Sequence, residues 1–345
     1  MRVLVVGAGA WGTAVAIHIA RRHAVWLHAR DRCLADALAR ERVSARYLPA
    51  AVLPDAVRVG ASLEAAIAWL ADAGAADALL IVGTTVAGLR GTLGELRRQA
   101  AGRLDGVPLV WLCKGLETGS GSLPHEIAAQ AWPETGGAAL SGPSFAQEVA
   151  AGLPVALTVA SRAEAPRAAA VRALHHDAAR IYRSDDIVGV EIGGALKNVM
   201  AIAAGIADGL ALGHNARAAL ITRGLAEIAR FGVARGARPE TFMGLTGLGD
   251  LVLTCTGDLS RNRRVGLGLA AGQPLAAVLT GLGHVAEGVP CTEEVVRQAA
   301  RHRVEVPIAA AVGAVLAGSM LPREAVLALL AREPRDESDR RQALA

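Results

Sequence analysis

The segment RVLVVGAGAWGTAVAIHIARR, residues 2–22, decides the fold of the N-terminal half. Its first five residues predict a buried strand, and its alanine-rich end predicts a helix. Gly7, Gly9 and Gly12 form a GxGxxG pattern in the turn between them. At a first strand-to-helix turn, such glycines let the backbone approach a pyrophosphate, and the helix N-terminus offers unpaired N–H groups. The segment therefore predicts a dinucleotide site rather than a plain glycine-rich turn.

Short Val/Leu/Ile runs continue to alternate with alanine-rich segments of helical length up to residue 185, as in crossover units on a parallel sheet. Strands are expected over Val3–Val6, Ala24–His28, Val57–Val59, Ala78–Val82, Pro108–Cys113, Val155–Ala160 and Arg180–Tyr182. Helices are expected over Thr13–Arg22, Leu63–Ala71, Ala87–Ala100, Leu123–Ala131 and Glu164–His175. We therefore expect a Rossmann-like, doubly wound α/β domain over residues 1–185.

After Ser184 the strand pattern stops and long segments rich in Ala, Leu and Ile follow, notably 192–210 and 216–235. We expect an all-helical domain over 186–331 and a charged, solvated tail over 332–345. Glycine in a helix costs roughly 1 kcal/mol relative to alanine. The glycines in this half therefore predict close helix packing or backbone beside a ligand. They stand at positions 193, 194, 205, 209 and 213.

Composition supports a globular protein of two domains. The chain has 345 residues, of which 52% are hydrophobic and 20% charged, which excludes intrinsic disorder. A net charge of +4 and only 3% aromatic residues do not favour a nucleic-acid partner. No apolar run reaches the ~18–20 residues of a membrane span, and a predicted strand follows Met1 where a signal peptide would need an apolar region. We expect a cytoplasmic protein with no membrane span.

The cysteines do not indicate a metal or redox site. The chain has four, widely spaced and without a CxxC pair, which predicts reduced and mostly buried thiols. The run His175-His176-Asp177 contains metal-ligating residue types, but neighbouring residues point in different directions and no spaced partner follows. We interpret that run as a loop and expect no metal.

The end of the second strand bears on the choice of cofactor. An NAD site needs an acidic residue there to accept hydrogen bonds from the adenosine ribose. This strand ends instead in Arg30 followed by Asp31. If the arginine faces the ribose, it pairs with a 2′-phosphate and favours NADP over NAD, whereas the carboxylate would repel that phosphate. The alternative for Arg30 is a solvated loop charge.

Polar residues follow several other predicted elements. Lys114 ends the strand VPLVWLC, where open parallel sheets place ligand contacts. SGPSFAQE (141–148) supplies hydroxyls and a helix start that could bind an anion. The alternative is that Ser144 is an ordinary N-cap. Lys197 in GGALKN stands in an apolar helical stretch, where a lysine is rare unless paired or functional. GLGD adds a carboxylate at Asp250. SRNRR (260–264) is expected to begin a helix and could form a phosphate pocket; the alternative is a basic helix start that is simply solvated.

These residues resemble the bacterial type of the NAD(P)-dependent glycerol-3-phosphate dehydrogenase family. Blocks in the right order run through almost the whole chain. They are VGAGAWGTA, WLCKGLE, LSGPSFAQEVAAGLP, GVEIGGALKNVMAIAAG, ALITRGLAEIARFG, FMGLTGLGDLVLTCTGDLSRNRR and VAEG. The resemblance implies NADPH or NADP as cofactor, with NADH or NAD as further candidates, and glycerol 3-phosphate and dihydroxyacetone phosphate as substrates. It also implies a homodimer and a supply of glycerol 3-phosphate for glycerophospholipid synthesis.

The resemblance also implies roles for individual residues. Lys197 would be the proton acceptor, with Asp250 fixing its position. The substrate would contact Lys114, Gly142, Ser144, Lys197, Asp250, Ser260, Arg261 and Asn262. The cofactor would contact Gly7, Gly9, Ala10, Trp11, Gly12, Arg30, Lys114, Ala146, Arg261, Val285 and Glu287.

Two segments depart from the family pattern. A Val-Pro-Ser type of turn is expected after the fourth strand, but the chain reads Val82-Gly83-Thr84-Thr85, which affects contacts near the nicotinamide. Pro290 follows Glu287 unexpectedly. Two rival functions are also open: a ketopantoate or hydroxyacid reductase of the same two-domain plan, which would use a carboxylate substrate, and a dinucleotide sensor without turnover.

Overall fold

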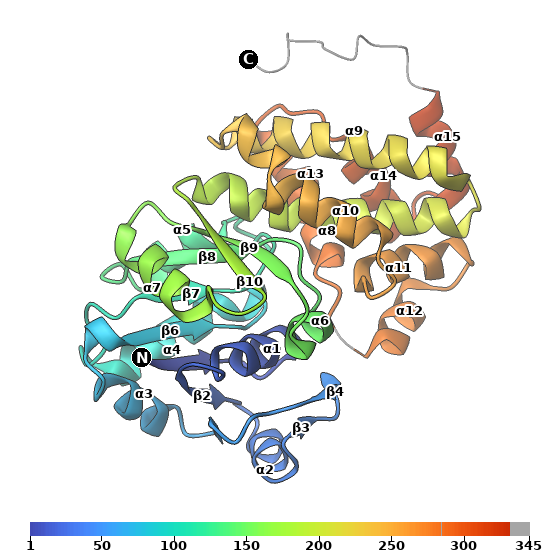
Figure 1. Ribbon diagram of the computed structural model, residues 1–345. Coiled ribbons are helices and arrows are strands. Elements are labelled where there is room, and N and C mark those ends of the chain that lie inside the picture. The colour runs from blue at the N-terminus through green and yellow to red at the C-terminus, as the bar shows by residue number, and fades with distance from the viewer. Residues whose placement is uncertain (284, 332–345) are drawn as a thin grey trace. The chain divides into compact units, whose positions relative to one another are not determined.

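The computed structural model describes residues 1–283 and 285–331, so the predicted charged tail lies outside the described residues. The chain forms two compact units (Figure 1). Unit 1 comprises Met1–Lys114 and Pro124–Ile187, and unit 2 comprises Gly115–Leu123 and the described residues from Val188 onward. The sequence placed one boundary between residues 185 and 186. The observed boundary lies two residues later, and the short segment Gly115–Leu123 belongs to unit 2.

Unit 1 is built on an eight-stranded sheet with the strand order β10-β9-β8-β7-β6-β1-β2-β5. Its strands are β1 (Arg2–Val6), β2 (Ala24–His28), β5 (Val57–Gly60), β6 (Ala78–Val82), β7 (Leu109–Trp111), β8 (Gly137–Ser141), β9 (Val155–Ala160) and β10 (Ala179–Ser184). A separate hairpin consists of β3 (Val43–Ser44) and β4 (Leu48–Val52). The helices are α1 (Ala10–Ile19), α2 (Arg32–Glu41), α3 (Leu63–Ala71), α4 (Val86–Ala100), α5 (Pro124–Ala131), α6 (Ala146–Ala151) and α7 (Glu164–Leu174), with a 3-10 turn η1 (Ala75–Asp77).

The strand order makes the sheet doubly wound around β1. This strand pairs in parallel with both β2 and β6, so that Val3 lies opposite Val25 and Leu79. The chain extends to β5 on one side of β1 and through β7 and β8 on the other. Ligands of such sheets bind at the carboxyl ends of the strands where the order reverses. The glycine turn after β1 lies at this point, as the sequence predicted.

The sheet is not parallel throughout. β8 pairs antiparallel with β9, and β9 pairs parallel with β10, so the last two strands run opposite to the others. The crossover pattern read from the sequence implied a parallel sheet and missed β8, whose sequence GAALS has little of the usual strand residues. It also missed the β3–β4 hairpin and α2, a short helix that is polar on average although its apolar residues have helical spacing.

Alternate residues of each strand serve opposite faces of the sheet. Val3 and Val5 of β1 lie in a core that also contains buried residues of α1, α2, α6 and α7. Leu4 and Val6 are equally buried on the other face, where α3 and α5 contact the strands and α4 packs between them. Both faces are therefore covered (Figure 1), which explains the nearly continuous apolar runs of the central strands.

A stacked pair of histidines joins the C-terminal end of α1 to the loop after α7. The rings of His18 and His176 are parallel, with centroids 4.1 Å apart, and both residues are buried. His18 Nε2 bonds the Leu174 carbonyl at 2.9 Å, and His176 Nδ1 bonds Asp177 at 3.2 Å. Burial lowers the pKa of His18, and the neighbouring His176 and Arg21 add to that effect. Residues 175–177 therefore form a loop, as predicted, and the His176 ring of this loop is buried against His18.

This stack makes the stability of unit 1 sensitive to acid. Because the pKa of His18 is lower in the folded than in the unfolded protein, the unfolded state takes up more protons as the pH falls through about 6.5. The melting temperature should therefore fall between pH 7.5 and about 5.5. His18→Gln keeps a donor for the Leu174 carbonyl but does not titrate. The melting temperature of this variant should therefore fall less over the same pH range. Each kcal/mol of stability that the variant retains corresponds to roughly 2–4 °C. Calorimetry across this pH range measures the difference.

The matched control for this prediction is His302→Gln, at an exposed histidine of unit 2. It should reproduce the acid dependence of the unsubstituted protein. Parallel curves for His18→Gln and the unsubstituted protein would contradict the assignment of the acid effect to the stack.

Unit 2 is helical in its described part, apart from loops and turns. Its helices are α8 (Ile187–Gly209), α9 (Gly213–Ala234), α10 (Asp250–Thr256), α11 (Arg261–Ala270), α12 (Leu275–Leu282), α13 (Gly288–Arg301), α14 (Pro307–Leu316) and α15 (Pro322–Leu330). A 3-10 turn η2 (Pro239–Met243) and a π-helical turn η3 (Leu245–Gly249) precede α10. The predicted long helices 192–210 and 216–235 correspond to α8 and α9.

Close helix packing explains the glycines of α8. A Cβ at Gly193 would lie 2.4 Å from the Thr246 carbonyl oxygen, and one at Gly205 would lie 2.0 Å from that of Arg263. By length and composition α8 is long and apolar enough to cross a membrane, contrary to the expectation from the sequence. Its apolar stretch is 100% buried inside the protein, as expected for a core helix. We therefore interpret α8 as the central helix of unit 2.

Two buried carboxylates fasten other parts of unit 2. Glu227 of α9 is fully buried and accepts hydrogen bonds from the backbone N–H groups of Ile308 and Ala309, both at 2.9 Å, in the first turn of α14. Glu294 of α13 is also buried and accepts from the N–H of Gly119 at 3.2 Å. This second contact holds the segment Gly115–Leu123 against α13.

Candidate functional site

The glycine turn after β1 has the backbone that a dinucleotide needs. Gly7 has φ +120°, and a Cβ there would lie 2.8 Å from the carbonyl group of Gly83. A Cβ at Gly12 would lie 2.1 Å from the Gly7 oxygen, so helix and strand meet directly. No atom lies within 4 Å of the position that a Cβ on Gly9 would take. The second glycine therefore leaves open the space that a pyrophosphate requires, and α1 begins at the next residue.

The departure at residues 82–85 fits this turn. The N–H of Gly83 donates to the Val6 carbonyl at 2.8 Å, and the backbone of Gly83 packs directly on Gly7 and Gly12. Nearby lie buried polar atoms, Trp11 Nε1 and Thr84 Oγ1, which have no hydrogen-bond partner within the described part of the chain. Ala10 and Trp11, both predicted cofactor contacts, form the start of α1.

Arg30 and Asp31 differ in what their side chains do. Both are exposed in the loop between β2 and α2. The Asp31 carboxylate is the N-cap of α2, since its Oδ1 accepts from the N–H of Cys33 at 2.9 Å and of Leu34 at 3.4 Å. The carboxylate that would repel a 2′-phosphate is thus bound to a helix start, which favours Arg30 as the residue facing a ribose phosphate.

Three predicted substrate residues of unit 1 meet at one carbonyl group. Lys114 Nζ donates to the Gly142 oxygen at 3.2 Å, and Ser144 Oγ donates to the same oxygen at 3.0 Å. Gly142 follows β8 with φ +129°, a conformation that favours glycine. The alternative of Ser144 as an N-cap is wrong, because α6 begins at Ala146 with Phe145 as its N-cap. The Ser144 hydroxyl bonds back to the loop, two residues before α6 begins.

The central pair of unit 2 is formed by Lys197 of α8 and Asp250, the first residue of α10. Lys197 Nζ donates to Asp250 Oδ1, and both side chains are buried, with 9% and 1% of their surface exposed. Thr254 Oγ1 donates to the Asp250 carbonyl at 2.6 Å and lies 3.4 Å from its Oδ1. The close approach of α8 to η3 at Gly193 brings the two charges together. Each charge compensates the burial of the other.

An amide relay starts at the residue after Lys197. Asn262 Nδ2 donates to Asn198 Oδ1 at 2.9 Å, and Asn262 Oδ1 accepts from the N–H of Gly288 at 3.0 Å. Asn198 in turn donates to the Gly194 carbonyl at 3.4 Å. Asn198 and Gly288 were not among the predicted site residues, although an amide beside the lysine of an apolar helix was a signal. Asn262 is therefore a link between α8, α11 and α13, with at most one N–H left for a ligand.

The remaining predicted residues of unit 2 lie at helix starts. Ser260 is the buried N-cap of α11, and its Oγ accepts from the N–H of Arg263 at 3.2 Å. Arg261 is exposed at the first position of that helix. Val285 is 55% exposed, and Glu287 is the N-cap of α13. The unexpected Pro290 lies in the first turn of α13, where proline is tolerated because its missing N–H has no intrahelical partner.

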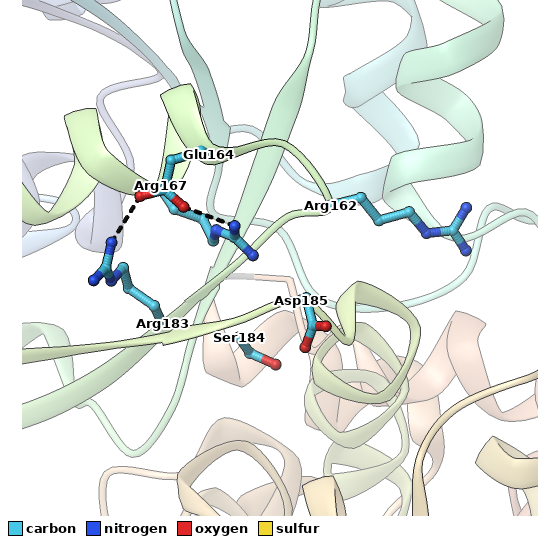
Figure 2. A pocket seen from close by; sticks show the side chains of 6 residues that line it. All are labelled: Arg162, Glu164, Arg167, Arg183, Ser184 and Asp185. Atoms are coloured by element: carbon cyan, nitrogen blue, oxygen red, sulfur yellow. Dashed lines mark hydrogen bonds and ion pairs between the residues drawn. The ribbon is translucent and has the colours of Figure 1, made fainter.

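Unit 1 also has an open depression of about 460 Å³ away from these residues. Figure 2 shows its lining, Arg162, Glu164, Arg167, Arg183, Ser184 and Asp185. The two oxygens of Glu164 bond Arg167 and Arg183, each at 2.7 Å. Two of its three guanidinium groups therefore already have a carboxylate partner, and we assign it no part in the site.

Metal and thiol chemistry find no support in the described residues. Within 1–283 and 285–331 no group of three or more His, Cys, Asp or Glu side chains is placed to hold a metal ion. Cys113, Cys255 and Cys291 are buried and Cys33 is exposed, which agrees with the prediction of mostly buried thiols. Burial raises the pKa of Cys255 and of Cys291 to about 12, so both stay protonated at neutral pH.

A dinucleotide turn at the switch point of unit 1 and a buried lysine–carboxylate pair in unit 2 define the class of two-domain nicotinamide-dependent dehydrogenases. Two family models match the chain: the N-terminus of NAD-dependent glycerol-3-phosphate dehydrogenase over residues 2–166 and its C-terminus over 186–327. The chain therefore belongs to the NAD-dependent glycerol-3-phosphate dehydrogenase family.

Individual relatives agree with the family models. Glycerol-3-phosphate dehydrogenase [NAD(P)+] from Paucimonas lemoignei is 54% identical over 98% of this chain and 99% of its own length. The enzyme of the same name from Leptothrix cholodnii is 55% identical over 98% of this chain and all of its own length. A crystal structure of glycerol-3-phosphate dehydrogenase from Coxiella burnetii is 37% identical and has a TM-score of 0.89, covering 96% of this chain and 99% of that one. The predicted family, fold class and enzyme class are thereby confirmed.

Proposed function

We propose that this protein interconverts sn-glycerol 3-phosphate and dihydroxyacetone phosphate by hydride transfer with NADPH or NADH. The observation that carries the proposal is the buried Lys197–Asp250 pair, which supplies a proton-transferring group held by a fixed carboxylate. The family membership and the names of relatives 54–55% identical to the chain support the choice of substrate.

The residues of the glycine turn fit the cofactor. The open space at Gly9 and the start of α1 would receive the pyrophosphate, and exposed Arg30 would receive a 2′-phosphate. Ala10, Trp11, Lys114, Ala146, Arg261, Val285 and Glu287 remain predicted contacts. When bound, the nicotinamide accepts a hydride from C2 of glycerol 3-phosphate or returns one to C2 of the ketone.

Proton transfer is assigned to Lys197. During oxidation its amine would take the proton of the C2 hydroxyl, and during reduction its ammonium group would donate to the ketone oxygen. Asp250 would hold Nζ in place in both directions, and Thr254 would orient the carboxylate. Because Lys197 leaves a helix packed through glycine contacts, its stem has little room to move. This rigidity would keep the donor beside the reacting oxygen.

Substrate binding is assigned to helix starts and to the loop after β8. Arg261 at the start of α11 offers an exposed guanidinium and adjacent N–H groups to the substrate phosphate. Lys114, Gly142 and Ser144 form a second polar group around one carbonyl oxygen. Ser260 and Asn262 would serve mainly by fixing the start of α11, since their side chains already bond within the protein.

One assay tests the proposal against its rivals. The absorbance of NADPH should fall on addition of dihydroxyacetone phosphate and stay constant with ketopantoate or other keto acids. Turnover of a keto acid instead would identify the carboxylate reductase. Binding of NADPH without turnover of any keto substrate would identify the dinucleotide sensor.

The choice between cofactors gives a separate prediction. We expect kcat/KM to be higher with NADPH than with NADH, because Arg30 stands where an NAD enzyme places an acid. In Arg30→Ala, kcat/KM should fall about tenfold or more with NADPH, which corresponds to the loss of one charge-assisted hydrogen bond. With NADH, kcat/KM should change little. Steady-state kinetics with both cofactors measure the loss. Equal losses would remove Arg30 from the cofactor site.

Three broader expectations accompany the proposal. The homodimer is a prediction that light scattering on the purified protein would test. A cytoplasmic location and a role in supplying glycerol 3-phosphate for glycerophospholipids also stay predictions. A block of glycerophospholipid synthesis after loss of the gene, relieved by added glycerol 3-phosphate, would support that role.

A further inference from the structure

The loop between β2 and α2 presents two side chains of opposite charge next to each other. Arg30 suits a cofactor with a 2′-phosphate, whereas a carboxylate in this loop would suit a free ribose and repel the phosphate. Both residues are exposed, so burial does not decide which one faces the ribose. The choice between NADPH and NADH therefore depends on where the Asp31 carboxylate is held.

The structure holds that carboxylate on α2. Asp31 has an extended backbone (φ −76°, ψ 117°), as an N-cap requires, and its Oδ1 accepts from the N–H groups of Cys33 and Leu34. The partial positive charge of a ten-residue helix also compensates the carboxylate. The bond fixes the backbone directly after Arg30, so the direction in which that side chain leaves the strand depends on the cap.

The other basic side chains next to this loop are Arg32 and His28. Arg32 is largely exposed and lies 4.0 Å from Asp36, a weak pair on the surface of α2. His28, at the end of β2, is buried and bonds the Ala61 carbonyl at 3.2 Å, and burial lowers its pKa, so it adds little charge at neutral pH. With the Asp31 carboxylate held on the helix, Arg30 is the cation at the end of β2, and Arg32 is the first residue of α2.

We propose that Asp31 is a specificity-determining positioning residue, which selects NADPH by capping α2 and thereby directing Arg30 to the 2′-phosphate. The inference rests on the proposed function only in requiring that the chain binds a nicotinamide dinucleotide. It adds that selectivity resides in a backbone contact of Asp31 and not in Arg30 alone.

The test compares three variants that separate charge from capping. Asp31→Asn and Asp31→Ser remove the charge but keep a side-chain oxygen that can cap the helix, whereas Asp31→Ala removes both. Dissociation constants for NADPH and NADH are measured by titration of cofactor fluorescence. The ratio of NADH to NADPH constants should stay high in the Asn and Ser variants and fall about fivefold or more in the Ala variant.

Arg30→Ala supplies the second arm. If Asp31 acts through Arg30, the Asn and Ala variants should have the same ratio when each is combined with Arg30→Ala. A melting curve of each variant checks that it is folded. A lower melting temperature for Asp31→Ala with an unchanged ratio would overturn the proposal and leave Asp31 with a structural role alone.

The other outcomes are equally decisive. If Asp31→Asn and Asp31→Ser weaken NADH several-fold and leave NADPH unchanged, the carboxylate contacts the ribose and the proposal is wrong. Because binding is measured without substrate, a chain that binds both cofactors but does not reduce dihydroxyacetone phosphate would overturn the proposed function and leave the Asp31 test valid. Failure of the unsubstituted protein to bind either cofactor would overturn both.

Discussion

Lys197→Met should lower kcat for dihydroxyacetone phosphate by about 10²-fold or more, with little change in the dissociation constant of NADPH. Methionine keeps an apolar stem of similar length but cannot exchange a proton. The cofactor residues of unit 1 are untouched by this change, so NADPH binding serves as the check on the fold. Single-turnover kinetics at saturating NADPH measure the rate of the chemical step.

A second variant covers the risk that Lys197→Met leaves Asp250 without a partner. Removing one member of a buried ion pair is strongly destabilising. Lys197→Arg keeps a positive charge for Asp250, but a guanidinium does not give up its proton in proteins. It should therefore fold and still lose most of its turnover. Near-normal turnover in either folded variant would show that Lys197 only packs and pairs.

Arg261→Ala should lower kcat/KM for dihydroxyacetone phosphate by about tenfold to a hundredfold, the equivalent of one charge-assisted hydrogen bond. With unphosphorylated dihydroxyacetone the loss should be small, because that substrate has no phosphate to bind. The measurement is made at saturating NADPH, since Arg261 is also a predicted cofactor contact. The side chain is exposed at the first position of α11, so its removal should not disturb the fold.

Arg264→Ala is the matched control, because it removes the same charge one turn further along α11, also at an exposed position. Its kcat/KM should stay within about threefold of the unsubstituted protein. Equal losses for the two variants would indicate a general electrostatic effect of the helix. Equal losses of Arg261→Ala with both substrates would move the phosphate pocket elsewhere.

The parts of the fold that were predictable depend on local patterns. The GxGxxG turn, the first strand and α1 follow one another within the first 22 residues, so the sequence alone indicates their arrangement. Lys197 was a candidate because a lysine in an apolar helix needs a partner. Its partner was also proposed, since the resemblance supplied Asp250, 53 residues further on.

The missed features depend on contacts distant in sequence. Asn262 donates a hydrogen bond to Asn198, 64 residues away in the sequence, and neither residue type by itself predicts that contact. The N-cap alternative for Ser144 rested on its residue type, which favours caps, but its hydroxyl donates to the Gly142 carbonyl. The strand β8 forms because β7 and β9 pair with it on both sides, which outweighs the weak preference of its own residues.

The discontinuous make-up of unit 2 affects how the chain is synthesised and how it can be divided. Gly115–Leu123 leaves the ribosome more than 170 residues before Glu294, whose buried carboxylate accepts a hydrogen bond from the N–H of Gly119. Unit 2 therefore cannot complete its hydrogen bonds from its own C-terminal half. A fragment starting at Val188 would keep the bonds of Glu294 to Arg297 and Gln298 but would lose the N–H of Gly119 and, for Arg297, the Gly119 carbonyl that accepts its hydrogen bond. Fusing residues 115–123 to such a fragment is the design that the fold favours.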